Sequence, residues 1–211
     1  MTRRSPRRTS RLTKSSAAWL ARQRRDPYAG RAVSRAYFKL EQLDARFRLT
    51  GRDRVVLELG AAPGGWTEYL GPRCRLVVAC DLLPLAAVPA GVRTVLGDAR
   101  EPSTQRRILA TAGVSAERPF DVVLSDMAPN ISGNRVRDQA VTLELVECTL
   151  GLAERWLRPG GRVVVKTFHG AGFDDLVRDV RARFADVVMA KPGASRGGSR
   201  EVYATGRYGV E

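Results

Sequence analysis

Residues 55–66, Val55-Val-Leu-Glu-Leu-Gly-Ala-Ala-Pro-Gly-Gly-Trp66, decide the fold of this chain. The first five, Val55–Leu59, form an apolar and partly β-branched run that is typical of a strand buried in a parallel sheet. A glycine-rich turn begins at Gly60 and leads into a predicted helix that starts near Trp66. A strand, a tight glycine turn and a helix in this order open a nucleotide-binding α/β fold.

The composition of the turn limits which nucleotide it can bind. Gly60, Ala62 and Gly65 give G-x-A-x-x-G, which is one step from the dinucleotide-binding pattern. Pro63 removes a backbone N–H from a loop whose amides would hold a pyrophosphate, and no Gly-Lys-Ser/Thr follows, which excludes a P-loop. S-adenosylmethionine has no phosphate, and glycine lets its amino-acid end approach the backbone closely. The turn alone leaves open an ordinary strand-to-helix connection in another α/β protein.

From Arg54 onwards the sequence alternates between strand and helix patterns. We predict strands at Val55–Leu59, Leu76–Cys80, Arg93–Leu96, Asp121–Ser125 and Arg162–Thr167, and helices at Thr67–Leu70, Ser103–Ala112, Ala140–Leu157 and Phe173–Phe184. Two further strand-like runs, Asp186–Lys191 and Glu201–Thr205, predict an antiparallel hairpin at the end. The fold class is therefore α/β, with one doubly wound, mostly parallel, seven-stranded sheet.

Two helices are predicted ahead of the sheet. The second, Ser34 to Arg48, carries an apolar stripe made of Ala36, Leu40, Leu43 and Phe47. Beside it runs a basic face made of Arg35, Lys39, Gln42 and Arg46, and such a face is usually only solvated. We expect a disordered basic arm over residues 1–16 and one domain over 17–211, divided into N-terminal helices (17–50, with a first helix from Ala17 to Arg25) and a core (51–211).

The formal net charge of +14 is concentrated at the N-terminus. Residues 1–35 hold eleven Lys and Arg side chains against one acidic residue, Asp26, which gives this segment +10. A basic arm attracts a polyphosphate such as RNA by releasing counterions, whatever the nucleotide sequence. A solvated tail or an organelle transit peptide would have the same composition, so both alternatives remain open.

Several protein classes are disfavoured by composition. The sequence has no run of about 18 apolar residues and no apolar region of a secretory signal, so we expect neither a membrane span nor secretion. Its three cysteines, Cys74, Cys80 and Cys148, are odd in number and form no C-x-x-C pair, which argues against disulfides and a zinc site. We expect a cytoplasmic monomer without a metal ion.

Charged residues follow several of the predicted strands. Because ligands of such sheets bind at the carboxyl ends of the strands, the residues there are candidates for the site: Gly60, Asp81, Asp98, Asp126 and Lys166. Asp81 is placed to accept hydrogen bonds from both ribose hydroxyls of the cofactor, and Asp98 is placed near its adenine. Charged residues are rarely buried without a purpose, so the set favours a binding site over helix capping.

Six ordered motifs resemble the FtsJ-like RNA 2′-O-ribose methyltransferases, over about Ser16 to Gly206. The motifs are Ser34-Arg-Ala-Tyr-Phe-Lys-Leu40, Leu59-Gly-Ala-Ala-Pro-Gly-Gly-Trp66, Cys80-Asp-Leu-Leu-Pro84, Ser125-Asp-Met-Ala-Pro-Asn130, Val164-Val-Lys166 and Ser199-Arg-Glu-Val-Tyr203. The resemblance implies the fold of S-adenosylmethionine-dependent methyltransferases. It also implies a catalytic tetrad at Lys39, Asp126, Lys166 and Glu201, and cofactor contacts at Gly64, Trp66, Asp81, Asp98 and Asp126 in addition to Gly60. The sequence departs from the family motif at His169, where we expect glutamine. His169 is the only histidine of the chain, and we expect it to be structural.

The residue types favour methylation of oxygen. Methylation at C5 of a pyrimidine uses a cysteine that usually follows proline, whereas Arg73, Ala79 and Glu147 precede the cysteines here. Methylation of a base amino group generally shows Asn/Asp-Pro-Pro-aromatic, which residues 126–130 do not match. Our hypothesis is that Lys166 is the base for the ribose hydroxyl, that Lys39 orients it, and that the two carboxylates hold the lysines.

Alternatives remain outside and inside this class. A dinucleotide oxidoreductase is disfavoured by Pro63 and by strand-end lysines with no role in hydride transfer. An RNA-binding assembly factor with an inactive site is disfavoured because all four tetrad positions are filled. The family resemblance points to a uridine in the A-loop of large-subunit (23S) ribosomal RNA within the assembled subunit, while tRNA or an mRNA cap would suit the same chemistry. A basic arm does not discriminate among them, since it contacts phosphate.

Overall fold

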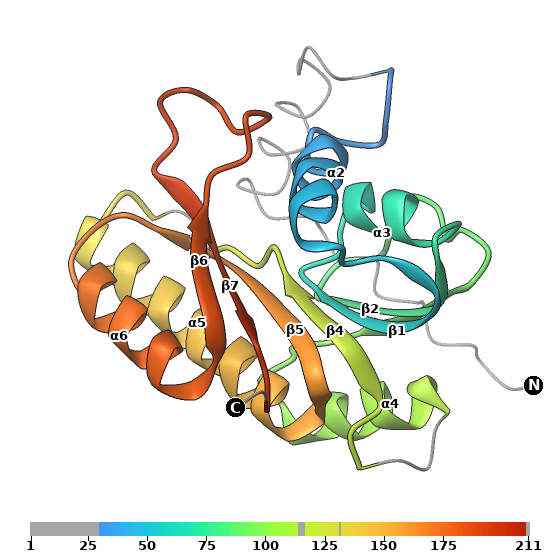
Figure 1. The fold of residues 1–211 in the computed structure, drawn as a ribbon. Coiled ribbons are helices and arrows are strands. Elements are labelled where there is room, and N and C mark those ends of the chain that lie inside the picture. Colours follow the sequence, from blue (N-terminus) through green and yellow to red (C-terminus); the bar gives the residue numbers. More distant parts are fainter. Residues whose placement is uncertain (1–29, 114–116, 131, 210–211) are drawn as a thin grey trace, which may run out of the picture.

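The computed structural model describes residues 30–113, 117–130 and 132–209, which form a twisted sheet with helices on both faces (Figure 1). The predicted arm 1–16 and the predicted helix 17–25 lie outside the described residues. Among the helices described, none is both long and apolar enough to cross a membrane.

Strands and helices alternate along the chain much as predicted. The first elements are α2 (Ala36–Phe47), β1 (Gly51–Leu59), α3 (Gly65–Leu70), β2 (Cys74–Asp81), β3 (Val92–Leu96) and α4 (Pro102–Ala112). They are followed by β4 (Phe120–Ser125), α5 (Arg135–Trp156), β5 (Leu157–Phe168), α6 (Phe173–Arg183), β6 (Ala185–Ala190) and β7 (Glu201–Arg207). The prediction of five parallel strands followed by an antiparallel pair is confirmed.

The order of the strands across the sheet is β3-β2-β1-β4-β5-β7-β6. The last strand, β7, lies between β5 and β6 and is antiparallel to both. In this register Lys166 of β5 pairs with Tyr203, and Phe168 pairs with Glu201. The insertion of β7 therefore brings residues that are about 35 positions apart in sequence side by side at one end of the sheet.

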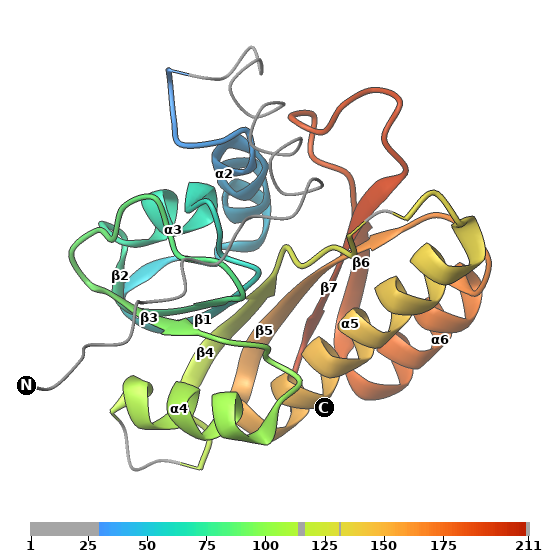
Figure 2. The same ribbon diagram turned by 180° about the vertical axis from the view of Figure 1, so that it is seen from behind.

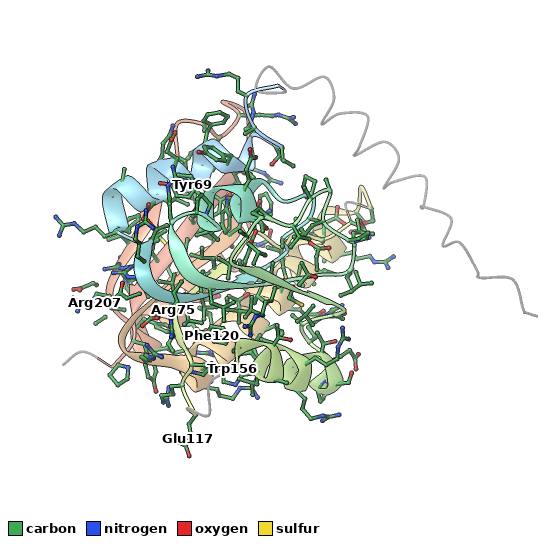
Figure 3. All side chains as sticks on the ribbon, turned by 90° about the vertical axis from the view of Figure 1, so that its right-hand side faces the viewer. Tyr69, Arg75, Glu117, Phe120, Trp156 and Arg207 are labelled. Atoms are coloured by element: carbon green, nitrogen blue, oxygen red, sulfur yellow. The ribbon has the colours of Figure 1, made fainter. Side chains whose placement is uncertain are left out.

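The two faces of the sheet have separate hydrophobic cores. Helices α2 and α3 cover one face, and α4, α5 and α6 cover the other (Figures 1 and 2). Figure 3 shows Tyr69 on the side of α2 and α3, and Phe120 and Trp156 on the opposite side, where their ring centroids are 6.1 Å apart. The central strands contribute to both cores because successive side chains point to opposite faces: Val163 and Val165 pack on one core and Val164 on the other.

Three predicted starts were wrong by four or five residues, including that of β1, which begins at Gly51 rather than Val55. Helix α5 begins at Arg135 rather than Ala140, because Asn134 caps it: Asn134 Oδ1 accepts hydrogen bonds from the backbone amides of Val136 (3.1 Å) and Arg137 (3.2 Å). Strand β5 begins at Leu157 rather than Arg162, because Leu157 pairs with Phe120 of β4 across the Pro-Gly-Gly segment. The start of α5 thus depends on a local cap that the hydrophobic pattern does not record, whereas the start of β5 depends on pairing with a distant strand.

Candidate active site

Five predicted residues lie at or beside the carboxyl ends of the parallel strands. Gly60 follows β1, Asp81 ends β2, Asp98 follows β3, Asp126 follows β4, and Lys166 lies near the end of β5. The strands that carry them are neighbours in the sheet, so these residues lie along one edge. The doubly wound fold predicts a ligand site at this edge of the sheet. The side chains described below meet there.

Lys166 is bound by both the side chain and the backbone of Asp126. Its Nζ lies 3.0 Å from Asp126 Oδ1 and also donates a hydrogen bond to the backbone carbonyl of Asp126. The side chain of Lys166 is only 8% exposed, which is rare for lysine unless it is paired. Strands β4 and β5 pair directly, so two adjacent strand ends fix this ion pair.

A second ion pair joins α2 to β7. Lys39 Nζ lies 2.6 Å from Glu201 Oε1, and both side chains are nearly buried. Leu40 and Leu43 anchor α2 in the core, which sets the height and rotation of Lys39 on the helix. One turn further, Gln42 Oε1 accepts a hydrogen bond from the backbone amide of Ala194 at 3.1 Å. Two members of the predicted basic face therefore contact β7 and the loop that precedes it.

Tyr203 is hydrogen-bonded to one ion pair and lies two residues from a member of the other. Its hydroxyl donates to Asp126 Oδ1 at 2.8 Å, and it shares one face of β7 with Glu201, two residues earlier. Burial, followed by the nearby charges of Asp126 and Glu201, raises the pKa of Tyr203 well above its usual value, so the hydroxyl stays protonated and can only donate to the carboxylate. Sequence reasoning quoted Tyr203 within a motif but gave it no role. The available signal in the sequence was its position two residues after Glu201, which places both side chains on one face of a strand.

The glycine turn brings three strand ends into close contact. A Cβ on Gly60 would lie 2.7 Å from the backbone nitrogen of Met127, so only glycine allows the turn to approach the segment after β4. The amide of Ala62 donates to Asp81 Oδ2 and the amide of Leu83 donates to Oδ1, each at 2.8 Å. Burial raises the pKa of the Asp81 carboxyl, although these amides oppose the shift. Each oxygen of Asp81 can still accept a further hydrogen bond.

Gly64 and Trp66 of the same turn have different environments. Gly64 has φ +118°, a conformation that favours glycine, and a Cβ there would lie in ordinary van der Waals contact, 3.9 Å from the carbonyl oxygen of Ala87 and from Leu85 Cδ2. Trp66 is 2% exposed, and its ring centroid lies 5.8 Å from that of Tyr203. Its indole N–H has no hydrogen-bond partner within the described ranges. Trp66 thus packs between the turn and Tyr203, and its predicted contact with the cofactor stays a prediction.

Asp98 differs from Asp81 because an arginine side chain already binds its carboxylate. The Arg100 guanidinium lies 2.7 Å from Asp98 Oδ2, and the Nε and backbone N–H of Arg100 donate to Oδ1. These hydrogen bonds hold the pKa of Asp98 below its usual value. Asp98 therefore lies at the predicted edge but already has a cationic partner, and its predicted role beside the adenine stays a prediction.

A buried carboxyl beneath the turn was missed by the sequence analysis. Glu58, in β1, is 1% exposed, and Thr67 Oγ1 of α3 donates to Glu58 Oε2 at 2.7 Å. Burial, with smaller contributions from the charges of Asp126 and Asp81, raises the pKa of Glu58 to about 8. The side chain is therefore largely protonated at neutral pH, and it links β1 to α3 below the site. A glutamate inside an otherwise apolar strand was the available signal.

His169 lies just beyond β5 and is exposed. Its ring centroid lies 4.3 Å from that of Phe173, and its backbone amide donates to the carbonyl of Arg200 at 3.0 Å. The described contacts of His169 are therefore packing and backbone contacts, as expected for a structural residue.

The three cysteines lie in or against the hydrophobic cores. Cys74, Cys80 and Cys148 are free thiols, and burial raises the pKa of each. Within the described ranges no group of three His, Cys, Asp or Glu side chains could hold a metal ion. The thiols of Cys74 and Cys80 pack in the core.

Chemically, the edge offers a carboxylate that can accept two hydroxyl groups and, next to it, a buried cluster of lysine–carboxylate pairs. The first suits the ribose of a nucleoside, and the second suits the orientation and deprotonation of a hydroxyl. Asp126 belongs to the lysine cluster, and its predicted contact with a cofactor stays a prediction.

Comparisons with known proteins show which family this chain resembles. Residues 32–208 match the model of the family described as FtsJ-like methyltransferase. The chain is 43% identical over 199 residues to ribosomal RNA large subunit methyltransferase E of Legionella pneumophila, covering 90% of this chain and 95% of the relative. It is 40% identical over 203 residues to the protein of the same name from Cellvibrio japonicus, covering 92% and 94%.

Solved structures share the fold. A Plasmodium falciparum protein assigned as a ribosomal RNA methyltransferase superposes with a TM-score of 0.71 at 22% identity, covering 83% of this chain and 97% of that one. A Burkholderia thailandensis N-methyltransferase, crystallised with S-adenosylhomocysteine, superposes with a TM-score of 0.56 at 18% identity, covering 92% and 87%. With a family model matched over most of its length and relatives at 40% identity or more, the chain belongs to the FtsJ-like methyltransferase family.

Proposed function

We propose that this protein transfers a methyl group from S-adenosylmethionine to the 2′-hydroxyl of a ribose in RNA. The observation that carries the proposal is the presence of two nearly buried ion pairs, Lys166 with Asp126 and Lys39 with Glu201. Tyr203 donates to Asp126 and packs on Trp66 of the glycine turn. Membership of a methyltransferase family supports the reaction type.

The residues of the turn fit this cofactor. Asp81 has one backbone donor on each carboxylate oxygen and can accept one ribose hydroxyl on each. Gly64 has no side chain, so the amino-acid end can approach the backbone of the turn closely. The Burkholderia protein of this fold was crystallised with S-adenosylhomocysteine, which is S-adenosylmethionine without its methyl group. When bound, it supplies an activated methyl group on a sulfonium.

We infer that Lys166, after its ammonium group has released a proton, is the base for the acceptor hydroxyl. A neutral amine has two N–H donors and one lone pair. In the structure Nζ contacts two acceptors, the Oδ1 and the backbone carbonyl of Asp126. With both N–H groups held there, the lone pair is directed at a third position, where the ribose hydroxyl would donate its proton as it attacks. A positioned base of this kind contributes about 10²–10⁴-fold.

The remaining members of the tetrad position Lys166 and the substrate. Tyr203 donates to the same carboxylate of Asp126 that holds Lys166, and the Lys39–Glu201 pair joins α2 to β7 at the same edge. In-line transfer requires the attacking oxygen, the methyl carbon and the sulfur to be aligned, and such alignment can supply much of the rate enhancement. Asp126, Glu201 and Lys39 are accordingly expected to affect the rate more than cofactor binding.

We propose a uridine in the A-loop of large-subunit (23S) ribosomal RNA, within the assembled subunit, as the acceptor. The relatives from Legionella and Cellvibrio are named as large-subunit ribosomal RNA methyltransferases. In a regular duplex the 2′-hydroxyl lies in a shallow minor groove, so a buried base such as Lys166 favours a loop nucleotide that can be splayed out. The N-terminal segment 1–35, with its net charge of +10, would add contacts to phosphate. We also propose that the enzyme acts as a monomer in the cytoplasm.

The test is transfer of labelled methyl from S-adenosylmethionine to three acceptors in parallel: undermethylated large ribosomal subunits, free ribosomal RNA and bulk tRNA. Label on the subunits, lost with Lys166→Ala, is the expected result. Label on tRNA alone would keep the chemistry and overturn the acceptor. A protein that binds S-adenosylmethionine and RNA but labels none of the three would instead be an assembly factor with an inactive site.

A further inference from the structure

A pocket of about 490 Å³ opens beside the active site, and the mechanism above does not use it. It lies between the first turns of α5 and the loop that joins β5 to α6, with Arg200 from the segment before β7 at its border. Figure 1 shows these three segments converging at the end of the sheet where the loop between β6 and β7 projects.

The pocket is joined to the active site through two strands. Arg200 directly precedes Glu201, and because successive residues of an extended chain point to opposite sides, Glu201 faces Lys39 while Arg200 faces the pocket. Gly170 of the pocket follows β5 and is four residues beyond Lys166. The amide of His169 donates to the carbonyl of Arg200 at 3.0 Å, which fastens the two lining segments together.

The walls of the pocket are apolar apart from two polar side chains, Gln139 and Arg200. Val136, Ala140 and Leu143 line the pocket from α5, and Val136 is 82% exposed, a degree of exposure that often marks a contact surface when other apolar side chains lie beside it. Gln139 Nε2 donates to the carbonyl of Ala171 at 3.0 Å, so the amide is held in place and its Oε1 can accept a hydrogen bond from a ligand.

Glycines keep the pocket open. A Cβ on Gly170 would lie 3.0 Å from Gln139 Oε1, and a Cβ on Gly172 would lie 3.4 Å from Leu143 Cδ1. Gly172 also has φ +78°, a conformation that side chains other than glycine rarely adopt. Both positions thus favour a residue that leaves the space between α5 and the loop unfilled.

We propose that this pocket binds the base of a nucleotide that neighbours the acceptor nucleotide in the RNA chain. The base would be unstacked from its neighbours, its face would contact the apolar side chains, and one of its N–H groups would donate to Gln139 Oε1. Arg200 would contact the phosphate of the same nucleotide. An apolar slot with one fixed amide and one guanidinium matches the parts of a nucleotide. This inference rests on the proposed function, since it places the substrate RNA across the edge of the sheet from Lys166 to the pocket.

The test fills the pocket and measures methyl transfer to undermethylated large ribosomal subunits. Ala140→Trp places an indole against the apolar wall, and Ala182→Trp, on the exposed surface near the far end of α6, is the matched control. We expect Ala140→Trp to raise the KM for subunits about tenfold, as expected for loss of one stacked base. The Kd for S-adenosylmethionine should stay unchanged, and Ala182→Trp should behave like the wild type.

The outcomes separate this inference from the proposed function. If the wild type labels no RNA, the proposed function fails. If the wild type labels subunits and Ala140→Trp retains its KM, only the pocket inference is overturned. Should Ala140→Trp not fold, Val136→Ala removes an exposed part of the wall without touching the core, and an unchanged KM for subunits would overturn the inference equally.

The occupant itself can be identified with a photoreactive benzoylphenylalanine at position 136. Irradiation of the complex with ribosomal subunits should give a cross-linked product that ribonuclease shortens. A cross-link to a ribosomal protein in place of RNA would show that a peptide occupies the pocket and would contradict the assignment to a base.

Discussion

The two halves of the site are built in different ways. The cofactor half, which comprises residues 60–66, Asp81 and Asp98, comes from consecutive strand ends and is held by backbone amides that donate to Asp81. The acceptor half, which comprises Lys39, Asp126, Lys166, Glu201 and Tyr203, comes from four distant elements and is held by side-chain ion pairs. Substitutions should therefore separate binding of the cofactor from transfer of the methyl group.

Lys166→Ala should produce the largest effect. Removing the base should lower kcat by about 10²–10⁴-fold, while the Kd for S-adenosylmethionine stays near that of the wild type, because the polar contacts of Lys166 are with Asp126 in the acceptor half. Rapid-quench methyl transfer and titration calorimetry measure the two quantities. Lys191→Ala is the control, since Lys191 is exposed and donates to the carbonyl of Ser199 in the loop before β7, so its kcat should be retained. Equal loss of kcat in both variants would contradict the assignment of Lys166.

Asp81→Asn should produce the reverse pattern. An amide cannot accept from both backbone donors and also from two ribose hydroxyls, so we expect the Kd for S-adenosylmethionine to rise about tenfold or more. The kcat at saturating cofactor should be largely kept. Asp98→Asn should have a smaller effect, because Arg100 already occupies that carboxylate. Calorimetric titration compares the two variants, and a larger loss of affinity for Asp98→Asn would reverse our ranking of the two carboxylates.

Tyr203→Phe tests the link inside the acceptor half. The variant removes the hydroxyl that donates to Asp126 but keeps the ring that packs on Trp66. Loss of a hydrogen bond to a charged group corresponds to about 1.5–3 kcal/mol at most, so we expect kcat to fall about tenfold, with cofactor affinity unchanged. Tyr208→Phe is the control, because Tyr208 packs on Phe184 away from this edge. A kcat for Tyr203→Phe equal to that of the wild type would show that Asp126 needs no support from Tyr203.

Glu58→Gln should have the smallest effect on methyl transfer, and an effect on stability that depends on pH. The pKa of Glu58 is raised to about 8 in the folded protein from its ordinary value of 4.5, so the folded state binds the extra proton between these values. Its contribution to stability is therefore complete below pH 4.5 and is lost as the pH rises through about 8. The glutamine side chain of the variant stays neutral at every pH and keeps an acceptor for Thr67.

Calorimetric Tm values of both proteins from about pH 5 to about pH 9 measure this difference. The wild type should lose more thermal stability than the variant as the pH rises, because only the wild type must bury a charged carboxylate. Parallel Tm profiles would mean that Glu58 does not titrate in this range.

Sequence reasoning could predict the cofactor half because its residues follow strands directly. The pattern of a buried strand, a glycine turn and an aspartate at the next strand end located Gly60 and Asp81 without any knowledge of packing. The tetrad, in contrast, came from family motifs. By pattern alone Lys39 belonged to an ordinary basic helix face, and only the docking of α2 against β7 turns it towards Glu201.

What the sequence could not show depends on long-range pairing. Tyr203 meets Lys166 only because β7 inserts between β5 and β6, and the partner of a strand is not encoded in its own alternation. Local side-chain partners were missed as well: Asp98, like Asp81, was predicted to contact the cofactor, but Arg100, two residues on, occupies its carboxylate. Glu58 lay in an apolar run and was treated as part of a strand, although its burial and its bond to Thr67 distinguish it.

The most direct test of the central claim is the chemical position of the transferred methyl. Undermethylated large subunits would be labelled with methyl from S-adenosylmethionine, and their RNA would then be hydrolysed in alkali. Because a 2′-O-methyl group removes the hydroxyl that attacks the neighbouring phosphodiester, our account predicts that all label is recovered in alkali-stable dinucleotides that contain methylated uridine. Label in mononucleotides that carry a methylated base would contradict it.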